Sequence, residues 1–157
     1  GFDADFGRAF AKSQTAAYGS LPTSGAVFVS IANRDKRTMI FPVKRLADLG
    51  FEILATHGTA DMLEQSGVQC RRANKVREGR PHIVDMIKND EISLIVNTTE
   101  GKRAIRESHS IRREAELRKV TYYTTVSAAH ATCDALDHLE DHDVNRLQDL
   151  HQELGAA

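Results

Sequence analysis

The chain has 157 residues, 41% hydrophobic and 27% charged, which suits one globular domain with a full core and excludes the disordered and collagen-like classes. Its 21 lysines and arginines nearly balance 22 aspartates and glutamates, and because proteins that bind phosphate backbones are normally basic, we expect no nucleic-acid partner. The charge is unevenly placed: from Asp134 onward seven acids face the single base Arg146, so residues 1–133 keep twenty bases and fifteen acids, a net charge of +5.

Residues 1–17 are predicted to form a short amphipathic helix, because Phe2, Phe6 and Phe10 fall on one face at helical spacing. Residues 18–25 are rich in Gly, Ser and Pro and are typical of a linker. We expect residues 1–25 to be a helix and linker from a preceding domain. The missing initiator methionine agrees with a piece of a longer chain.

Residues 26–157 are predicted to form the main domain, with an acidic helical tail from about residue 134. Strands are predicted at residues 26–31, 51–55, 68–73, 92–96 and 120–123. Helices are predicted at residues 36–49, 59–66, 81–88 (with Pro81 in its first turn), 102–119 (broken near 109–110), and 126–140, resuming through 154. Strands that alternate with helices indicate an α/β fold whose five-stranded, mostly parallel sheet is flanked by helices on both faces.

Two loops that follow predicted strands carry hydroxyl or amide side chains beside a glycine. They are Thr56-His57-Gly58-Thr59 and Asn97-Thr98-Thr99-Glu100-Gly101. Free N–H groups at a helix N-terminus attract an anion, and ligands of parallel sheets bind at the carboxyl ends of strands. Lys75 lies on a loop where its ammonium is placed to neutralise a phosphate. The alternative is that both loops are ordinary N-caps and that Lys75 belongs to a solvated basic loop.

Several site motifs are absent from the sequence. Neither a P-loop, a GxGxxG fingerprint, a GxSxG elbow nor an HExxH motif occurs. His138 and His142 stand four residues apart near Asp134 and Asp141, a spacing that suits a metal, but we expect an exposed acidic helix and no metal site.

The chain is also expected to be cytoplasmic. Cys70 and Cys133 are far apart and indicate two reduced thiols rather than a disulfide. No apolar run approaches the roughly 20 residues that span a bilayer, so we expect no contact with a membrane.

Four segments resemble the C-terminal allosteric domain of carbamoyl-phosphate synthetase large chains, which is a methylglyoxal-synthase-like domain. They are GFEILATHGT at residues 50–59, NKVREGRPHI at 74–83, IVNTT at 95–99 and IRR at 111–113. The resemblance covers residues 1 to about 130 in the family's order and spacing. It implies a three-layer, Rossmann-like domain with five strands that performs no chemistry itself and binds a nucleotide.

The resemblance also implies the effectors and their site. In bacterial members of the family UMP inhibits and IMP or ornithine activates the synthesis of carbamoyl phosphate, which serves pyrimidine and arginine biosynthesis. The residues onto which the family's nucleotide site falls are Lys36, Thr56, Thr59, Lys75, Asn97, Thr98, Thr99 and Ser108.

At two places the sequence departs from the family pattern, and these departures limit which functional properties of the family are expected in this chain. Tyr123-Thr124 stands where the family has an Asp-Thr pair that contacts ornithine, so this second effector region lacks its carboxylate. Methylglyoxal synthases carry a Gly-Gly-Asp segment where this chain has residues 78–81, Glu-Gly-Arg-Pro. The alternatives are therefore a lyase acting on dihydroxyacetone phosphate, which this departure argues against, and a structural or oligomerisation domain with a vestigial pocket.

The resemblance implies partners outside the domain. They are the rest of the large chain, an ATP-dependent ligase that uses Mg²⁺ and K⁺, and the glutaminase small subunit. The domain itself is expected to need no cofactor, and a further copy of the chain is a possible oligomeric partner.

Overall fold

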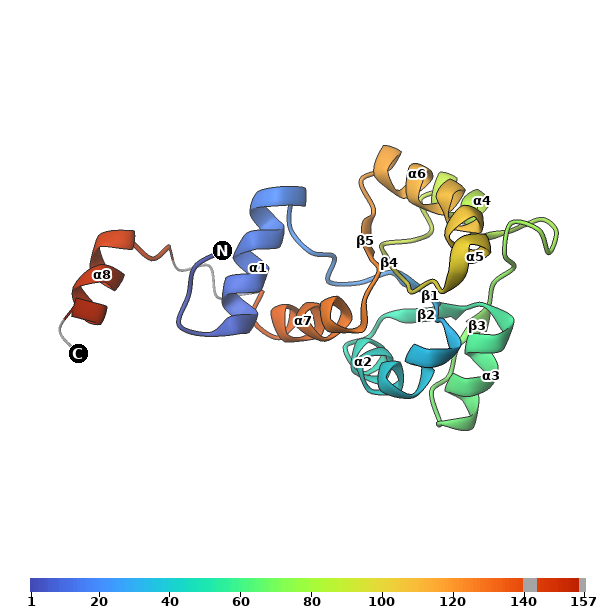
Figure 1. The fold of residues 1–157 in the computed structure, drawn as a ribbon, viewed down its shortest axis with the longest axis horizontal. Helices are drawn as coiled ribbons and strands as arrows, with labels where there is room; N and C mark the ends of the chain where they lie inside the picture. The colour runs from blue at the N-terminus through green and yellow to red at the C-terminus, as the bar shows by residue number, and fades with distance from the viewer. Residues whose placement is uncertain (140–143, 156–157) are drawn as a thin grey trace.

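A computed structural model describes residues 1–139 and 144–155, and Figure 1 shows the order of its elements. A 3₁₀ turn at Asn33–Asp35 precedes the second helix. The elements are α1 (Phe6–Tyr18), β1 (Ala26–Ser30), α2 (Lys36–Asp48), β2 (Glu52–Ala55), α3 (His57–Gln65), β3 (Arg71–Arg72), α4 (Ile83–Lys88), β4 (Leu94–Asn97), α5 (Gly101–Glu107), α6 (His109–Leu117), β5 (Thr121–Tyr123), α7 (Val126–Leu136) and α8 (Leu147–Gly155).

The five strands form one sheet in the order β3-β2-β1-β4-β5, and every pair is parallel. The predicted α/β fold is thus confirmed, with an all-parallel sheet. The third strand was predicted too long, because only Arg71 and Arg72 pair with β2. Val68 and Cys70 before them lie in the same apolar cluster as Ile53 of β2 but do not pair with that strand.

Both faces of the sheet are covered, which is why the central strands β1 and β4 are apolar without alternation. Val27 and Val29 of β1 face α2, α3 and α7, whereas Phe28 between them faces α4 and α6. In β4, Ile95 likewise faces α4 and α6. Figure 1 shows the two helical layers on opposite sides of the strands. The Rossmann-like, three-layer arrangement follows from these two buried faces.

Several predicted helix boundaries differ from the structure: α1 begins at Phe6 rather than at residue 1, because Asp5 is its N-cap, and α6 ends at Leu117 rather than at residue 119. α4 begins at Ile83 rather than in the turn of Pro81, because His82 caps it: His82 Nδ1 accepts from Asp85 N at 3.4 Å, and Asp85 Oδ2 accepts from His82 N at 3.1 Å. α3 begins at His57, two residues early, and α7 ends at Leu136. The predicted break near residues 109–110 is confirmed, since α5 and α6 meet at Ser108.

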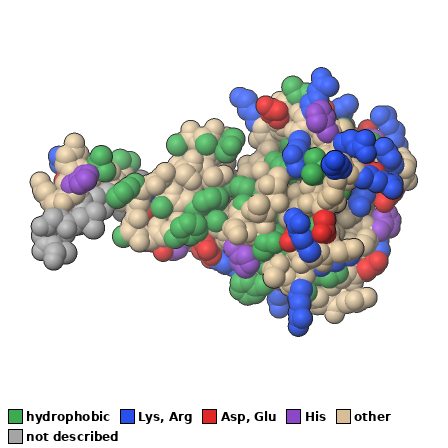
Figure 2. Space-filling view, in the orientation of Figure 1, with side chains coloured by type: hydrophobic (Ala, Val, Ile, Leu, Met, Phe, Trp, Pro, Cys, Tyr) green, Lys and Arg blue, Asp and Glu red, His purple; other side chains and the backbone are tan. Residues whose placement is uncertain are grey.

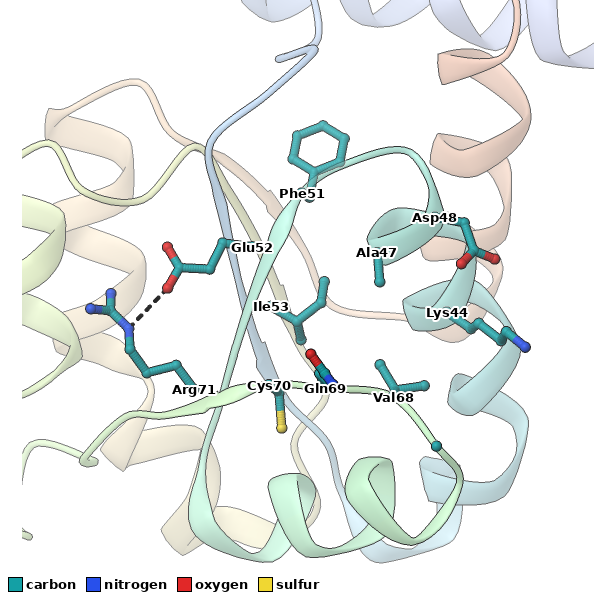
Figure 3. A pocket seen from close by; sticks show the side chains of 11 residues that line it. Lys44, Ala47, Asp48, Phe51, Glu52, Ile53, Val68, Gln69, Cys70 and Arg71 are labelled. Atoms are coloured by element: carbon teal, nitrogen blue, oxygen red, sulfur yellow. Dashed lines mark ion pairs between the residues drawn. The ribbon is translucent and has the colours of Figure 1, made fainter.

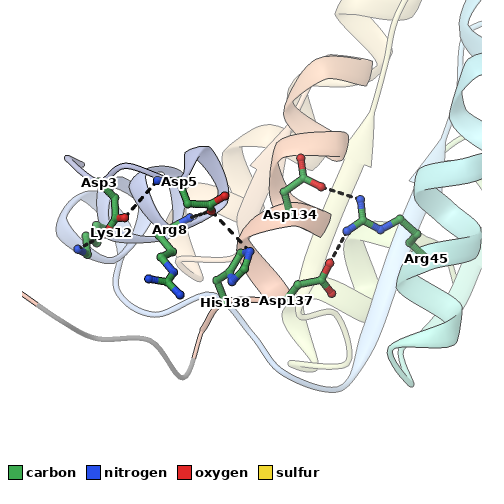
Figure 4. Close-up of polar contacts among 8 residues, drawn as sticks. All are labelled: Asp3, Asp5, Arg8, Lys12, Arg45, Asp134, Asp137 and His138. Atoms are coloured by element: carbon green, nitrogen blue, oxygen red, sulfur yellow. Dashed lines mark hydrogen bonds and ion pairs between the residues drawn. The ribbon is translucent and has the colours of Figure 1, made fainter.

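α1 lies against α7 and contacts the edge strand β5 of the sheet, and α7 in turn lies against α2 (Figure 1). Gly7 allows the close approach: a Cβ there would lie 2.7 Å from the carbonyl oxygen of Asp134. On the other side of α7, Arg45 of α2 donates to Asp134 Oδ1 at 2.7 Å and to Asp137 (Figure 4). Two acids of the predicted acidic tail thus hold α7 on the body.

The start of the chain is fixed by its own polar contacts (Figure 4). Asp5 caps α1 by accepting from Arg8 N at 3.0 Å, and Lys12 Nζ lies 2.6 Å from Asp3 Oδ2. That hydrogen bond is the main reason that the pKa of Asp3 falls to about 2.

Among residues 1–139 and 144–155, none of the helices has the length and apolar character of a membrane span. The assignment of residues 1–25 to a preceding domain stays a prediction.

Candidate functional site

A cavity of about 750 Å³ opens at the carboxyl ends of β1 and β4. These two neighbouring strands mark the point where the strand order reverses, since the chain leaves β1 toward β2 on one side and later returns to β4 on the other. Ser30 and Asn97 pair at the strand ends, and the segments that follow them form the floor and one wall. Parallel sheets bind ligands at such a switch point, and this volume suits a small molecule.

Five of the eight residues expected at the nucleotide site line this cavity: Lys75, Asn97, Thr98, Thr99 and Ser108. They come from the loop after β3, the loop after β4 and the junction of α5 with α6, so three segments far apart in the sequence converge. The other three expected residues are not among the lining residues: Thr56 and Thr59 lie at the start of α3, and Lys36, the first residue of α2, extends its ammonium toward that helix start.

At the start of α3 two threonine hydroxyls form hydrogen bonds that connect this helix to the segment after β1. Thr56 Oγ1 donates to Thr59 Oγ1 at 3.1 Å, and Thr59 Oγ1 accepts from the Ile31 N–H at 3.0 Å. Thr56 makes no side-chain cap to the helix, so its hydroxyl does not occupy the first N–H groups of α3. Lys36 Nζ lies 3.6 Å from the position that a Cβ on Gly58 would take. An ammonium and a helix N-terminus therefore meet beside the cavity.

Hydrogen bonds also fix the wall formed after β4. Asn97 is 3% exposed and its Nδ2 donates to Tyr122 Oη at 2.7 Å. Thr98 Oγ1 accepts from the Ala32 N–H at 2.9 Å, which ties this loop to the one after β1. Ser108 Oγ donates to the Ile105 carbonyl at 2.8 Å. The polar wall is thus set in place before any ligand arrives.

The rim of the cavity is strongly charged. Arg103 Nε lies 2.9 Å from Glu107 Oε1, and Arg77 Nη1 lies 3.4 Å from the same oxygen, so Glu107 joins the loop after β3 to α5. The hydrogen bond from Arg103 is the main reason that the pKa of Glu107 is lowered. Figure 2 shows Lys and Arg side chains gathered on the side of the molecule that carries α4, α5 and α6.

The second effector region at the end of β5 is closed by contacts within the chain. Tyr123 is 9% exposed, and its hydroxyl donates to Gln14 Oε1 of α1 at 2.8 Å. Burial raises the pKa of this phenol. Thr124 is exposed. Tyr123 therefore serves the contact between β5 and α1, and ornithine binding beside it stays untested.

A second cavity, of about 590 Å³, lies at the opposite end of the sheet (Figure 3). It separates the end of α2 from the start of β2 and the segment 67–71, and Glu52 and Arg71 pair across it at 3.1 Å. No expected site residue falls there, and it lies at the amino ends of the strands. We therefore take the cavity between β1 and β4 as the functional site.

Neither cavity contains a cluster of metal ligands. Within the part of the chain that the structure describes, no three His, Cys, Asp or Glu side chains are grouped to hold an ion. His138 lies 3.5 Å from Asp5 Oδ1 in the contact between α7 and α1, whereas His142 lies outside the described residues.

Several residues of the site could not be identified from the sequence alone. Tyr122 and Glu107 were missed, and Arg77 and Glu78 were noted only as part of a family motif. Tyr122 meets Asn97 across 25 residues of sequence, and Glu107 meets Arg77 across 30, so no local pattern contains either pair. The only available signal was their charge or polarity next to predicted strand ends.

Comparisons with known proteins agree with this fold. Over 151 residues the chain is 52% identical to the carbamoyl phosphate synthase large chain of Pseudomonas syringae pv. tomato, covering 96% of this chain and 14% of that protein. It is 48% identical to the large chain of Mycobacterium tuberculosis H37Rv, covering 100% of this chain and 15% of that protein. The chain thus spans only about one seventh of these relatives.

A solved structure shows the same fold at low sequence identity. The crystal structure of methylglyoxal synthase from Elizabethkingia anophelis NUHP1 aligns with a TM-score of 0.61 at 15% identity, over 84% of this chain and 93% of that one. The family model of the MGS-like domain matches residues 38–124, which is more than half of the chain. With an all-parallel five-stranded sheet and a cavity at its switch point, the chain belongs to the MGS-like domain family.

Proposed function

We propose that this chain is the effector-binding domain of a carbamoyl phosphate synthase large chain and that it binds a nucleoside monophosphate, UMP or IMP. The observation that carries the proposal is the cavity of about 750 Å³ into which Lys75, Asn97, Thr98, Thr99 and Ser108 converge. An ammonium, an amide and three hydroxyls suit a phosphate ester, and Lys36 of α2, whose ammonium lies by Gly58 of α3, adds a second cation beside them.

The identity of about one half to large chains, over almost all of this chain, supports the assignment to that protein. In the longer protein the effector would act by population shift. A nucleotide that prefers one conformation of the whole enzyme biases it by its differential affinity, typically about 1–3 kcal/mol. The rest of the large chain and the glutaminase small subunit would be the partners that respond, in the cytoplasm, while ATP, Mg²⁺ and K⁺ would serve the catalytic parts.

The direct test is calorimetric titration of the 157-residue chain with UMP and IMP. We expect saturable binding by the wild type, and a loss of about tenfold or more in K75A because a charge-assisted contact to the phosphate is removed. K88A is the matched control, since Lys88 is an exposed lysine of α4 outside both cavities. Absence of heat with both nucleotides at millimolar concentration would contradict the proposal.

Thermal melting separates this function from a purely structural role. A ligand at about 100 times its dissociation constant stabilises a protein by about 2.7 kcal/mol, so UMP or IMP should raise Tm. A vestigial pocket would leave Tm flat across the nucleotides. The likeness to methylglyoxal synthase is one of fold alone, and Glu-Gly-Arg-Pro at residues 78–81, in place of the Gly-Gly-Asp segment of those enzymes, argues against a lyase.

A further inference from the structure

The cavity between β1 and β4 carries an unusual mixture of charges for an anion site. Four cationic side chains line it, and three carboxylates lie among them. With Lys36 beside the cavity, the cations exceed the carboxylates by two, and Arg34, which lies near Glu100, leaves this balance unchanged because it also pairs with Asp35. The lining residues concerned are Lys75, Arg77, Arg103, Arg106, Glu78, Glu100 and Glu107.

Two of the three carboxylates lie within 4.0 Å of an arginine side chain. Glu107 is shared between Arg103 at 2.9 Å and Arg77 at 3.4 Å. Glu100 lies 4.0 Å from Arg34 Nη1. These two acids therefore chiefly position the arginines of the rim.

Glu78 differs from both. Its Oε2 accepts from the Lys75 N–H at 2.7 Å and lies 3.5 Å from His57 Nδ1, the first residue of α3. Among the described residues no Lys or Arg side chain pairs with it within 4.0 Å. Glu78 thus places a carboxylate that lacks a permanent cationic partner among the described residues beside the lysine of the cavity and near the helix N-terminus.

We propose that the cavity selects phosphate esters by their total charge, accepting monophosphates and rejecting di- and triphosphates, and that Glu78 sets this limit. The inference rests on the proposed function. A phosphate monoester carries about two negative charges at neutral pH, which the two excess cations balance. Each further phosphate adds negative charge without a free cation to meet it, and Glu78 repels it, since like charges brought together at a binding site are costly.

The test is calorimetric titration of the 157-residue chain and of E78Q with UMP, UDP and UTP in EDTA, so that only the phosphate number varies. Glutamine keeps an oxygen that accepts from the Lys75 N–H while it removes the charge. We expect the wild type to bind UMP at least about tenfold more tightly than UTP, and E78Q to reduce that ratio about fivefold or more. E64Q is the matched control, because Glu64 lies at the far end of α3, pairs with Arg72 at 2.7 Å and lines neither cavity.

The outcomes separate this inference from the function on which it rests. A wild type that binds UTP as tightly as UMP, or an E78Q ratio equal to that of E64Q, overturns the selection by Glu78 and leaves nucleotide binding intact. Phosphate and pyrophosphate, titrated in parallel, should show the same preference without a base. A chain that binds none of these anions overturns the proposed function and this inference together, and melting curves of both variants confirm that they are folded.

Discussion

The side-chain amide of Asn97 donates a 2.7 Å hydrogen bond to the phenol oxygen of Tyr122, and this bond joins β4 to the edge strand β5 at the wall of the cavity. Arg112 of α6 lies over the ring of Tyr122, with its guanidinium carbon 5.7 Å from the centroid. Tyr122 therefore holds the orientation of an amide that itself faces the cavity, and it is a positioning residue.

Removing this hydroxyl should weaken nucleotide binding. Y122F leaves the ring in place but takes away the acceptor for Asn97, and a hydrogen bond of this kind is worth about 1 kcal/mol. We expect UMP affinity to fall by about fivefold in calorimetry, with a small change in Tm.

The neighbouring tyrosine provides the matched control. Tyr123 points to the opposite face of the sheet, where its hydroxyl donates to Gln14 at 2.8 Å. Y123F should lower stability by about 1 kcal/mol and leave UMP affinity unchanged. Equal losses of affinity in both variants would show that Tyr122 does not act through Asn97.

Gly7 is expected to be essential to the packing of α1 on α7. Alanine ordinarily stabilises a helix interior by about 1 kcal/mol relative to glycine. Here, however, the added Cβ would lie 2.7 Å from the Asp134 carbonyl and 2.8 Å from His138 Cδ2. We expect G7A to destabilise the chain by about 1–3 kcal/mol in urea unfolding. T15A, at an exposed position of α1, should be neutral or slightly stabilising, and a stabilised G7A would mean that the two helices are not in close contact.

Arg45 should stabilise the contact between α2 and α7. Its guanidinium pairs with both Asp134 and Asp137, and the hydrogen bond that it donates to Asp134 is the main reason that the pKa of Arg45 is raised. R45M should cost about 1 kcal/mol in urea unfolding at low salt, and about half of that in 1 M NaCl, because the pairs are partly exposed and screened. R37M, on the exposed face of α2, should change stability little; a salt-independent loss in R45M would point to packing instead.

Cys133 is expected to make stability depend on alkaline pH. Its burial raises the pKa of the thiol from 9.0 to about 11. The folded state therefore holds the proton more tightly than the unfolded chain, so this contribution is complete below about pH 9 and is lost as pH rises through about 11. Because other groups titrate in the same range, the quantity to measure is the difference in unfolding free energy between the wild type and C133A. It should shrink between pH 8 and pH 11, and a constant difference would contradict the raised pKa.

The sequence predicts much of this fold because its strongest patterns coincide with complete burial. Val27–Val29 and Leu94–Val96 are apolar throughout since both of their faces are covered, and an uninterrupted apolar run is the sign of such a strand. The same pattern misleads at Val68, which is buried against the layer of α2 and α3 although the chain pairs with β2 only from Arg71. Pairing with a neighbour strand cannot be inferred from hydropathy alone.

The residues of the site likewise include some that the sequence predicts and some that it does not. Ligands of parallel sheets bind at the carboxyl ends of strands, and this rule predicts Asn97, Thr98 and Thr99, because those residues lie at or directly after the end of a strand. The same rule does not predict Tyr122 or Glu107. Their contacts depend on how β5 and α5 lie against segments that are distant in the sequence. The charge on Glu78 is visible in the sequence, but its lack of an arginine or lysine partner among the described residues is a property of the folded chain.

The brevity of β3 has a consequence for how copies of this chain behave at high concentration. A long, flat, apolar edge strand offers its free backbone groups to other molecules and promotes aggregation. Here the sheet ends in two exposed arginines, Arg71 and Arg72, whose side chains are engaged by carboxylates of β2 and α3. A foreign strand would find room for only one or two hydrogen bonds and would have to desolvate charged groups to make them. The edge is therefore protected against strand-to-strand assembly by its own length and polarity.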